Sequence, residues 1–403
     1  MRAALVFVLV VAGAVRADVT LVGVGTIPGT ASDLSGLKGK AKDGTPNDRL
    51  GGLGSAIAYA GTGDEYVLVS DRGPKDGTVP FVCRSHRMTV TVKPGAKEPV
   101  ALKLTATTLL TREDGKQFNG GLAAFTGAKP EDNLRLDAEG ARLSRTGTLF
   151  VSDEYGPVVY EFDAKGKRLR ALPVPDKFRA PKPGKTPNDE LPPHATTGRQ
   201  PNRGMEGLAI APDGSKLYGM MQGPLIQDGG LGAENKRVGR NCRILEIDTK
   251  TGAAREFVYH LSDASHGISE ILAVSATEFL VLERDGLGGT DAKFKQVFRI
   301  DISKASDVSA VESLPGGKLP KDIVPVKKEP FLDLLDPKFG IAGKNCPEKF
   351  EGLAFGPDLP DGKRLLLVSA DNDFVAEQPF RVYAFAVDRK DLPTFAPQVF
   401  DKK

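Results

Sequence analysis

The chain contains no tryptophan and few cysteine and histidine residues. Its 403 residues include no Trp, three Cys and four His. Without tryptophan, any repeat built on a Trp-Asp dipeptide is excluded. Cys83, Cys242 and Cys346 are too few and too widely spaced for a disulfide framework, and their spacing matches no recognisable zinc pattern. We expect them to be small buried residues that form one intramolecular disulfide at most.

Neither sign of charge dominates the composition. The sequence has 55 Lys and Arg residues against 52 Asp and Glu residues. Without the first 17 residues, which include Arg2 and Arg16, 53 basic residues remain against the same 52 acidic residues. This near-neutral balance gives no support to nucleic acid or a membrane surface as a partner.

Long hydrophobic runs are missing beyond the first residues. Arg2, the apolar run 3–15 and the small-residue site "VRA" at 15–17 are typical of an export signal. That run is short for a membrane span, and no later stretch is long enough. We therefore predict a signal peptide over 1–17 and a single domain over 18–403 without a membrane span. The expected location is secreted or periplasmic.

One short phrase occurs twice in the sequence. The stretches "MEGLAIAPDGSKLYGMM" (205–221) and "FEGLAFGPDLPDGKRLLLVS" (350–369) both run from Glu-Gly-Leu-Ala through a tight turn into an apolar strand. Three further stretches share the pattern of strand, polar turn and strand. The five copies are residues 55–73, 139–156, 206–223, 270–286 and 351–373. Such self-similarity indicates a repeated structural unit.

Each copy is followed by another run that is rich in β-branched and aromatic residues. These runs are residues 87–92, 157–163, 242–248, 296–301 and 380–387. No long stretch has an apolar period of 3.6 residues. Units of about four antiparallel strands, with 46 Gly and 29 Pro in the chain, predict an all-β fold, a β-propeller of five or six four-stranded blades. The alternative is a pair of β-sandwiches or another two-domain β protein.

The intervals between copies are longer than one blade needs. The copies begin 64 to 84 residues apart, and the excess lies in loops, chiefly the Pro-rich loop 173–204. This length leaves room for a sixth blade. The strand predicted over 19–27 has no unit of its own, so we expect it to complete the last blade and close the ring without an exposed sheet edge.

Acidic residues open the first strand and close the second strand of most copies. In a blade, a tight turn brings the outer ends of these two strands together at one mouth of the central channel. The opening position is occupied by Glu139, Glu206, Glu270 and Glu351. The closing ends carry Asp71-Arg72, Asp153-Glu154, Glu283-Arg284 and Asp371. We therefore expect a ring of carboxylates, with arginines among them, at one mouth.

A bound cation would relieve the repulsion within such a ring. So many carboxylates cannot all stay ionised close together unless positive charge joins them. Arginine supplies part of that charge, and a divalent cation such as Ca²⁺ would supply the rest through oxygen ligands. Our hypothesis assigns Glu206, Glu351, Asp153 and Asp371 to the metal. In the structural alternative, these acids only bind loop backbone N–H groups or pair with the arginines.

Four stretches resemble the exported esterase-like phytase family. They are residues 51–73, 151–163, 202–225 and 350–374, and they span most of the chain after residue 17. The resemblance implies a propeller domain that hydrolyses phosphate or other esters. The sequence departs from the histidine phosphatases, which use Arg-His-Gly, because it has only "SHG" at 265–267. The acidic calcium-binding signature of the better-known propeller phytases is not visible.

Metal-assisted hydrolysis suits these residues better than a Ser-His-acid mechanism, because no Gly-x-Ser-x-Gly elbow occurs. A cation would polarise an ester or phosphoryl oxygen and activate water. We assign proton transfer to Glu154 or Glu283 and the anionic group of the substrate to Arg72 and Arg284. His266, just before a first strand, is a further catalytic candidate, with a structural hydrogen bond as its alternative role.

Two other functions fit the same residues. One is a non-catalytic extracytoplasmic propeller that binds a protein or glycan at its mouth. The other is a calcium-dependent lactonase, which would use a similar acidic channel. The function that we predict is an exported hydrolase acting on a small-molecule ester or phosphoester.

Overall fold

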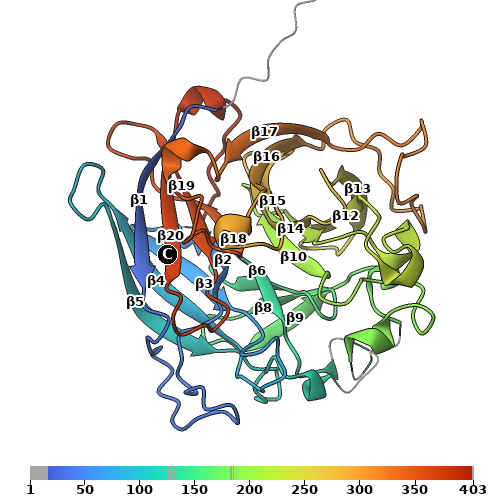
Figure 1. Ribbon diagram of the computed structural model, residues 1–403, viewed down its shortest axis with the longest axis horizontal. Helices are drawn as coiled ribbons and strands as arrows, with labels where there is room; N and C mark the ends of the chain where they lie inside the picture. Colours follow the sequence, from blue (N-terminus) through green and yellow to red (C-terminus); the bar gives the residue numbers. More distant parts are fainter. Residues whose placement is uncertain (1–16, 126–128, 130–131, 182–183, 185, 402–403) are drawn as a thin grey trace, which may run out of the picture.

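The protein is a five-bladed β-propeller. The computed structural model describes residues 17–125, 129, 132–181, 184 and 186–401, and their strands form five four-stranded sheets around a common axis (Figure 1). All but the last residue of the predicted signal peptide lies outside the described residues. The all-β prediction is thus confirmed, with five blades in the described part of the chain.

The strands follow one another in chain order within each blade. Blade 1 contains β2 (Leu53–Tyr59), β3 (Glu65–Ser70), β4 (Arg84–Val92) and β5 (Val100–Leu109). Blade 2 contains β6 (Ala138–Leu143), β7 (Leu149–Asp153), β8 (Val158–Phe162) and β9 (Arg168–Leu172). Blade 3 contains β10 (Met205–Ile210), β11 (Lys216–Met221), β12 (Asn241–Asp248) and β13 (Ala254–His260). Blade 4 contains β14 (Gly267–Ala273), β15 (Glu278–Arg284), β16 (Lys295–Asp301) and β17 (Lys327–Asp333). Blade 5 contains β18 (Phe350–Phe355), β19 (Arg364–Ala370), β20 (Phe380–Val387) and, from the N-terminal side, β1 (Val19–Ile27).

The helices are single 3₁₀ turns in the connections. They are η1 (Leu122–Ala124), η3 (Asp176–Phe178), η4 (Pro187–Glu190), η5 (Ile226–Asp228), η6 (Ala233–Asn235), η7 (Gly289–Asp291), η8 (Pro337–Phe339) and η9 (Arg389–Asp391). Within the described ranges, no helix has the length and apolar character that a membrane crossing requires.

The core lies between the blades. The inner strands β2, β6, β10, β14 and β18 contact one another in turn around the axis. Five apolar clusters each join two neighbouring blades, as where Val69 of β3 and Val151 of β7 pack in one cluster. Cys83, Cys242 and Cys346 are buried in the structure and form no disulfide. The inner strands are covered on both faces, so β2, β10 and β18 consist almost wholly of buried residues.

The N-terminal strand closes the ring, as predicted. Strand β1 pairs antiparallel with β20, from Val19 opposite Val387 to Ile27 opposite Phe380. Blade 5 therefore takes strands from both ends of the chain. The length that left room for a sixth blade lies in connections such as 173–204 and 302–326.

Deletion of residues 18–27 is expected to prevent cooperative folding. Without β1, strand β20 becomes an exposed edge and the ring loses its closure, so we expect aggregated protein without a sharp melting transition. A matched control shortens the exposed loop 36–44 by a similar length. Calorimetry and size-exclusion chromatography distinguish the two variants. A monomeric, cooperatively melting deletion protein would contradict the closing role of β1.

Candidate active site at the acidic mouth

Three glutamates lie at equivalent places on three inner strands. In β10 the register with β11 shifts between Met205 and Gly207, so Glu206 is the extra residue of a β-bulge. Strand β18 has the same shift at Glu351, and β6 has a shift that includes Glu139. A bulge turns its extra residue out of the ladder and re-aims its side chain. Equivalent bulges therefore direct carboxylates from blades 2, 3 and 5 to one mouth of the axis.

Carboxylates from four blades form a continuous arc at this mouth, which we call the acidic belt. Within each of three groups, carboxylate oxygens lie within 4.8 Å of one another. The groups are Asp71, Asp371 and Asp373; Asp71, Asp137 and Glu139; and Glu139, Glu154 and Glu206. Because Asp71 and Glu139 each belong to two groups, the belt runs from blade 5 through blades 1 and 2 to blade 3. Every member except Asp373 is buried.

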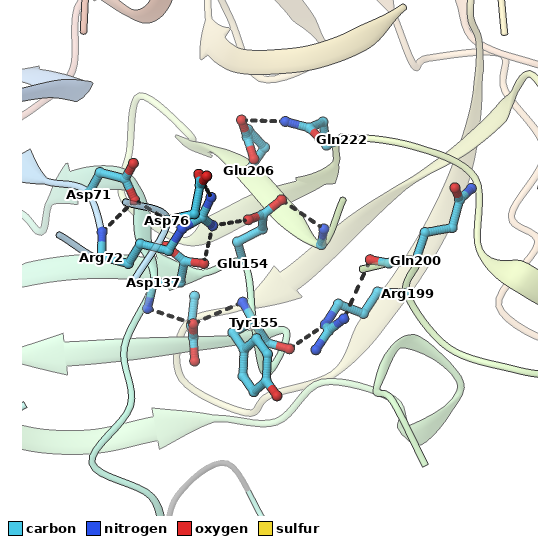
Figure 2. A network of polar contacts seen from close by, with 12 residues as sticks. Asp71, Arg72, Asp76, Asp137, Glu154, Tyr155, Arg199, Gln200, Glu206 and Gln222 are labelled. Atoms are coloured by element: carbon cyan, nitrogen blue, oxygen red, sulfur yellow. Dashed lines mark hydrogen bonds and ion pairs between the residues drawn. The ribbon is translucent and has the colours of Figure 1, made fainter. Parts of the chain in front are cut away.

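The belt carries more acids than its cations can neutralise. Arg72 lies 2.6 Å from Asp137 and 3.1 Å from Glu154, and Figure 2 shows it between the two carboxylates. Lys349 lies 3.8 Å from Asp71. The next glutamate around the mouth, Glu351, is 2.8 Å from Arg284. The ion pairs of the described residues thus bring three cations, Arg72, Lys349 and Arg284, to seven buried carboxylates. The seven are Asp71, Asp137, Glu139, Glu154, Glu206, Glu351 and Asp371.

Burial and mutual repulsion raise the pKa of most belt carboxyl groups. Burial first, and then repulsion from neighbouring carboxylates, raises the pKa of Asp371 to about 7. The same two causes hold the pKa values of Glu139 and Glu206 well above their usual value. Burial also raises the pKa of Glu154. The belt therefore cannot keep its full negative charge near neutral pH without a further cation.

Several belt oxygens have no partner within the described parts of the chain. The Glu139 carboxylate makes neither a hydrogen bond nor an ion pair there. Glu206 accepts a 2.6 Å hydrogen bond from Gln222 through Oε1, but its Oε2 is buried without a donor. Oδ2 of Asp371 is also buried without a donor. Unpaired, closely spaced carboxylate oxygens are the donor set that a hard divalent cation such as Ca²⁺ requires, so these residues fit that ion.

The metal-free protein is expected to be less stable at about pH 8 than at about pH 5. The folded-state pKa values of Glu139, Glu206 and Asp371 lie above the unfolded values, so between the two the folded state binds more protons. Unfolding free energy then falls as pH rises from the unfolded pKa through the folded pKa. Thermal melts in EDTA across this range test the sign, and added Ca²⁺ is expected to restore stability mainly at the alkaline end. Melting temperatures in EDTA that rise steadily with pH would contradict this result.

Six of the nine residues assigned from sequence lie at the mouth. Glu154, Glu206 and Asp371 are belt members. Arg72 is paired with the belt, and Arg284 and Glu351 form an ion pair beside it. The remaining three are Asp153, Glu283 and His266, which lie outside the belt.

Strand alternation accounts for the position of Asp153 and Glu283. Each precedes a mouth side chain by one residue, and successive residues of a strand point to opposite faces. The Asp153 carboxylate accepts 3.0 Å hydrogen bonds from the backbone N–H groups of Asp137 and Tyr155. Burial raises the pKa of Asp153 to about 7. Asp153 thus supports the backbone that carries the belt.

Glu283 and His266 form a separate polar cluster between blades 3 and 4. Glu283 accepts hydrogen bonds from the Tyr259 hydroxyl at 2.7 Å and from Lys328 at 2.5 Å. His266 Nδ1 lies 3.1 Å from Glu283, and its ring stacks on Phe294 with 4.1 Å between centroids. Burial opposes ionisation of Glu283, but the His266 and Lys328 contacts outweigh it and lower the pKa to about 2. Glu283 is therefore a poor proton acceptor.

Asp137 and Lys349 were not recognised from the sequence as residues of the mouth. Asp137 lies two residues before Glu139, and Lys349 lies two residues before Glu351. Residues two apart on a strand share a face, so this spacing was a usable signal. The prediction did not use this spacing, because it took the glutamate as the first residue of each repeat and left out the residues before it.

Glu270 does not occupy the position predicted for it. In β14 the register shift falls between Ile268 and Glu270, so Ser269 has the bulge position. Glu270 lies one step deeper, 3.0 Å from Arg142, and accepts a 3.0 Å hydrogen bond from the Leu208 N–H. The sequence prediction treated Glu270 as equivalent to Glu206 and Glu351. Strand β14 has one residue fewer between its glutamate and the following turn, so Glu270 lies one residue closer to that turn.

The pair of Arg142 and Glu270 closes the axis below the belt. Arg142 donates hydrogen bonds to carbonyl oxygens in blades 1, 4 and 5 at 3.2, 3.0 and 3.4 Å. Together with Glu270, it contacts the inner strands of all five blades. At the other end of the axis, a mainly apolar cavity of about 280 Å³ has Phe355 and Phe395 in its wall. The acidic mouth is therefore a recess and not the entrance to an open channel.

Fold and site together define a five-bladed propeller with a metal-compatible acidic recess at one mouth. A family model described as Phytase-like, with esterase-like activity of phytase, matches residues 48–374. A protein of Arthroderma benhamiae described as an uncharacterized secreted protein is 31% identical over 371 residues, and the match covers 74% of this chain and 70% of that protein. The chain belongs to the Phytase-like family.

Comparison with solved structures finds similarity at low sequence identity and low TM-score. A calcium-binding protein, regucalcin, from Agrobacterium tumefaciens is 12% identical with a TM-score of 0.37, covering 87% of this chain and 94% of that chain. The PQQ-bound aldose sugar dehydrogenase of Streptomyces coelicolor is 13% identical with a TM-score of 0.36, covering 93% and 99%. Similarity at this level carries no information about substrate or cofactor.

Proposed function

We propose that this protein is an exported hydrolase that cleaves a phosphate or other ester at the acidic belt with a bound divalent cation, most suitably Ca²⁺. The observation that carries the proposal is the unpaired Glu139 carboxylate within 4.8 Å of Glu154 and Glu206 oxygens. Family membership and a relative described as secreted support the hydrolytic and exported parts.

The belt residues would hold the ion between blades. Glu139 and Glu206 offer oxygens from two bulges, and these oxygens lie in one group with that of Glu154. Further along the belt, Asp71 shares a second group with Glu139 and a third with Asp371. A cation bound there supplies a Lewis acid for an ester or phosphoryl oxygen and lowers the pKa of water. Because the ligands come from different blades, the rigid ring fixes their spacing in advance of binding.

Glu154 is the preferred proton acceptor in this proposal. Its pKa is raised by burial, which brings it toward the working range of a general base. Arg72 at 3.1 Å and the Gly204 N–H at 3.3 Å fix its carboxylate. Glu283, the other acid assigned from sequence, is held by four donors and stays ionised.

A substrate panel with and without chelator tests the proposal. The purified protein is assayed on p-nitrophenyl phosphate, p-nitrophenyl acetate and a set of lactones, in Ca²⁺ and in EDTA. We expect chelator-sensitive cleavage of one of the two nitrophenyl esters. Cleavage of lactones alone would replace the proposal with a lactonase. Tight Ca²⁺ binding without any cleavage would favour a non-catalytic binding propeller.

A further inference from the structure

The C-terminal segment crosses the mouth of the propeller that lies opposite the acidic belt. We call this segment, residues 393–401, the strap. Its backbone N–H groups donate hydrogen bonds to the carbonyl oxygens of Val274 in blade 4, Pro212 in blade 3 and Arg145 in blade 2, at 2.8, 2.8 and 2.9 Å. Two phenylalanines of the strap pack on aromatic rings of blades 5 and 1, with 4.7 and 6.4 Å between ring centroids. The strap therefore contacts all five blades.

A mainly apolar cavity lies between the strap and the inner strands. It has a volume of about 280 Å³, and Phe395 and Pro397 of the strap form part of its wall. Ala58, Ala273 and Ala354 line it from blades 1, 4 and 5. These small side chains leave space where close packing fills most protein interiors. Pro397 is exposed, so the cavity reaches the surface beside the strap.

The charged residues in the wall of this cavity are already paired. Arg142 is 3.0 Å from Glu270 and donates hydrogen bonds to three carbonyl oxygens. Asp358 is 2.9 Å from Arg364, whose guanidinium carbon lies 4.2 Å from the centroid of the Phe395 ring. Each charge in the wall thus has an opposite charge beside it. A ligand with a net charge would enter the cavity without a counter-ion, which is unfavourable.

We propose that this cavity is a second ligand site, which binds an uncharged and mainly apolar small molecule about the size of two fused rings. An apolar cavity of roughly 150 Å³ holds one benzene ring. A volume of about 280 Å³ therefore has room for two. Water is held firmly only where about two to four polar groups surround it, so an apolar ligand displaces weakly bound water here. The site is independent of the proposed hydrolysis, because Arg142 and Glu270 close the axis between this cavity and the belt.

Three probes with the same ring system test the charge and size of the ligand. Indole is uncharged, indole-3-carboxylate is an anion and tryptamine is a cation at neutral pH. Their binding to the full-length protein is measured by ligand-observed NMR titration in Ca²⁺ and in EDTA. We expect indole to bind about tenfold or more tightly than either charged probe, with the same affinity in both buffers. Tightest binding of tryptamine would place the probes at the acidic mouth and overturn the inference.

Two substitutions that fill the cavity from different sides test its position. Ala273→Leu enlarges the wall in blade 4, and Ala396→Leu enlarges it from the strap. Each variant is expected to bind indole about tenfold or more weakly, and to melt at the temperature of the wild type or higher, because filling a cavity commonly stabilises a protein. Ala106→Leu, at a partly buried alanine of the outer strand β5, is the matched control and is expected to bind indole like the wild type.

A crystal of the wild type soaked in 5-bromoindole makes the test independent of how the variants fold. We expect an anomalous peak from bromine between the strap and the inner strands. Unchanged indole affinity in both filled variants would overturn the inference, and so would an equal loss of affinity in Ala106→Leu. A soaked crystal with bromine peaks only outside this cavity would overturn it as well.

Discussion

Glu139→Gln is expected to abolish calcium-dependent cleavage while raising the melting temperature of the metal-free protein. Glu139 belongs to two of the three carboxylate groups and has no cationic partner of its own among the described residues. The amide keeps the size of the side chain but removes its charge. Loss of a ligand shared by two groups is expected to lower metal affinity and turnover by about 100-fold or more. The stabilising effect in EDTA at alkaline pH follows because one source of repulsion is gone.

The opposite signs of these two effects make the prediction specific. A residue with a purely structural role would lower both stability and activity when it is replaced. Glu246→Gln is the matched control, since Glu246 is buried in blade 3 but is paired with Lys216 and Arg255. We expect this control to retain calcium binding and turnover. Normal calcium affinity in Glu139→Gln, measured by calorimetry, would remove Glu139 from the proposed site.

Glu270→Gln is expected to destabilise the protein by about 3–5 kcal/mol, the largest effect on stability that we predict for a single substitution. The substitution keeps an oxygen that can accept from Leu208 and Ile271 N–H groups, but it leaves the Arg142 guanidinium charged and without its carboxylate in the centre of the ring. An arginine cannot relieve this by losing its proton. Urea unfolding at neutral pH measures the difference.

The reverse substitution, Arg142→Met, is expected to cost less. Burial already raises the pKa of Glu270 to about 7, so the carboxyl group can take up a proton when its partner is removed. The destabilisation caused by Arg142→Met should therefore become smaller as pH falls. The double variant Arg142→Met/Glu270→Gln should be less destabilised than Glu270→Gln alone. Equal costs for the two single variants at every pH would show that the pair contributes packing and little electrostatic energy.

The repeat predicted the fold because every blade has to meet the same packing requirements. Each inner strand must line the axis, turn and return, so the phrases that begin at Glu206 and Glu351 recur with strands, turns and bulges at matching places. Closure by the N-terminal strand followed from its lack of a unit of its own. A sixth blade could not be excluded from loop lengths, because connections such as 302–326 carry no pattern of their own.

The site was predictable only as far as the repeat fixes two things for a side chain: its position along the channel axis and the face of the strand on which it lies. Glu206 and Glu154 were placed correctly at the mouth, whereas Glu270 was displaced by a single residue of turn length. The choice between Asp153 and Glu154 depended on strand alternation at a bulge, which the sequence does not mark.

The most direct test of the account is a long-wavelength anomalous difference map from crystals grown with Ca²⁺. The account predicts a peak at the acidic mouth, about 2.3–2.6 Å from carboxylate oxygens of Glu139 and Glu206, as calcium coordination requires. It also predicts that the peak is absent in crystals of Glu139→Gln. A wild-type map without a peak at this mouth, under conditions where calcium binds elsewhere on the protein, would contradict the central claim.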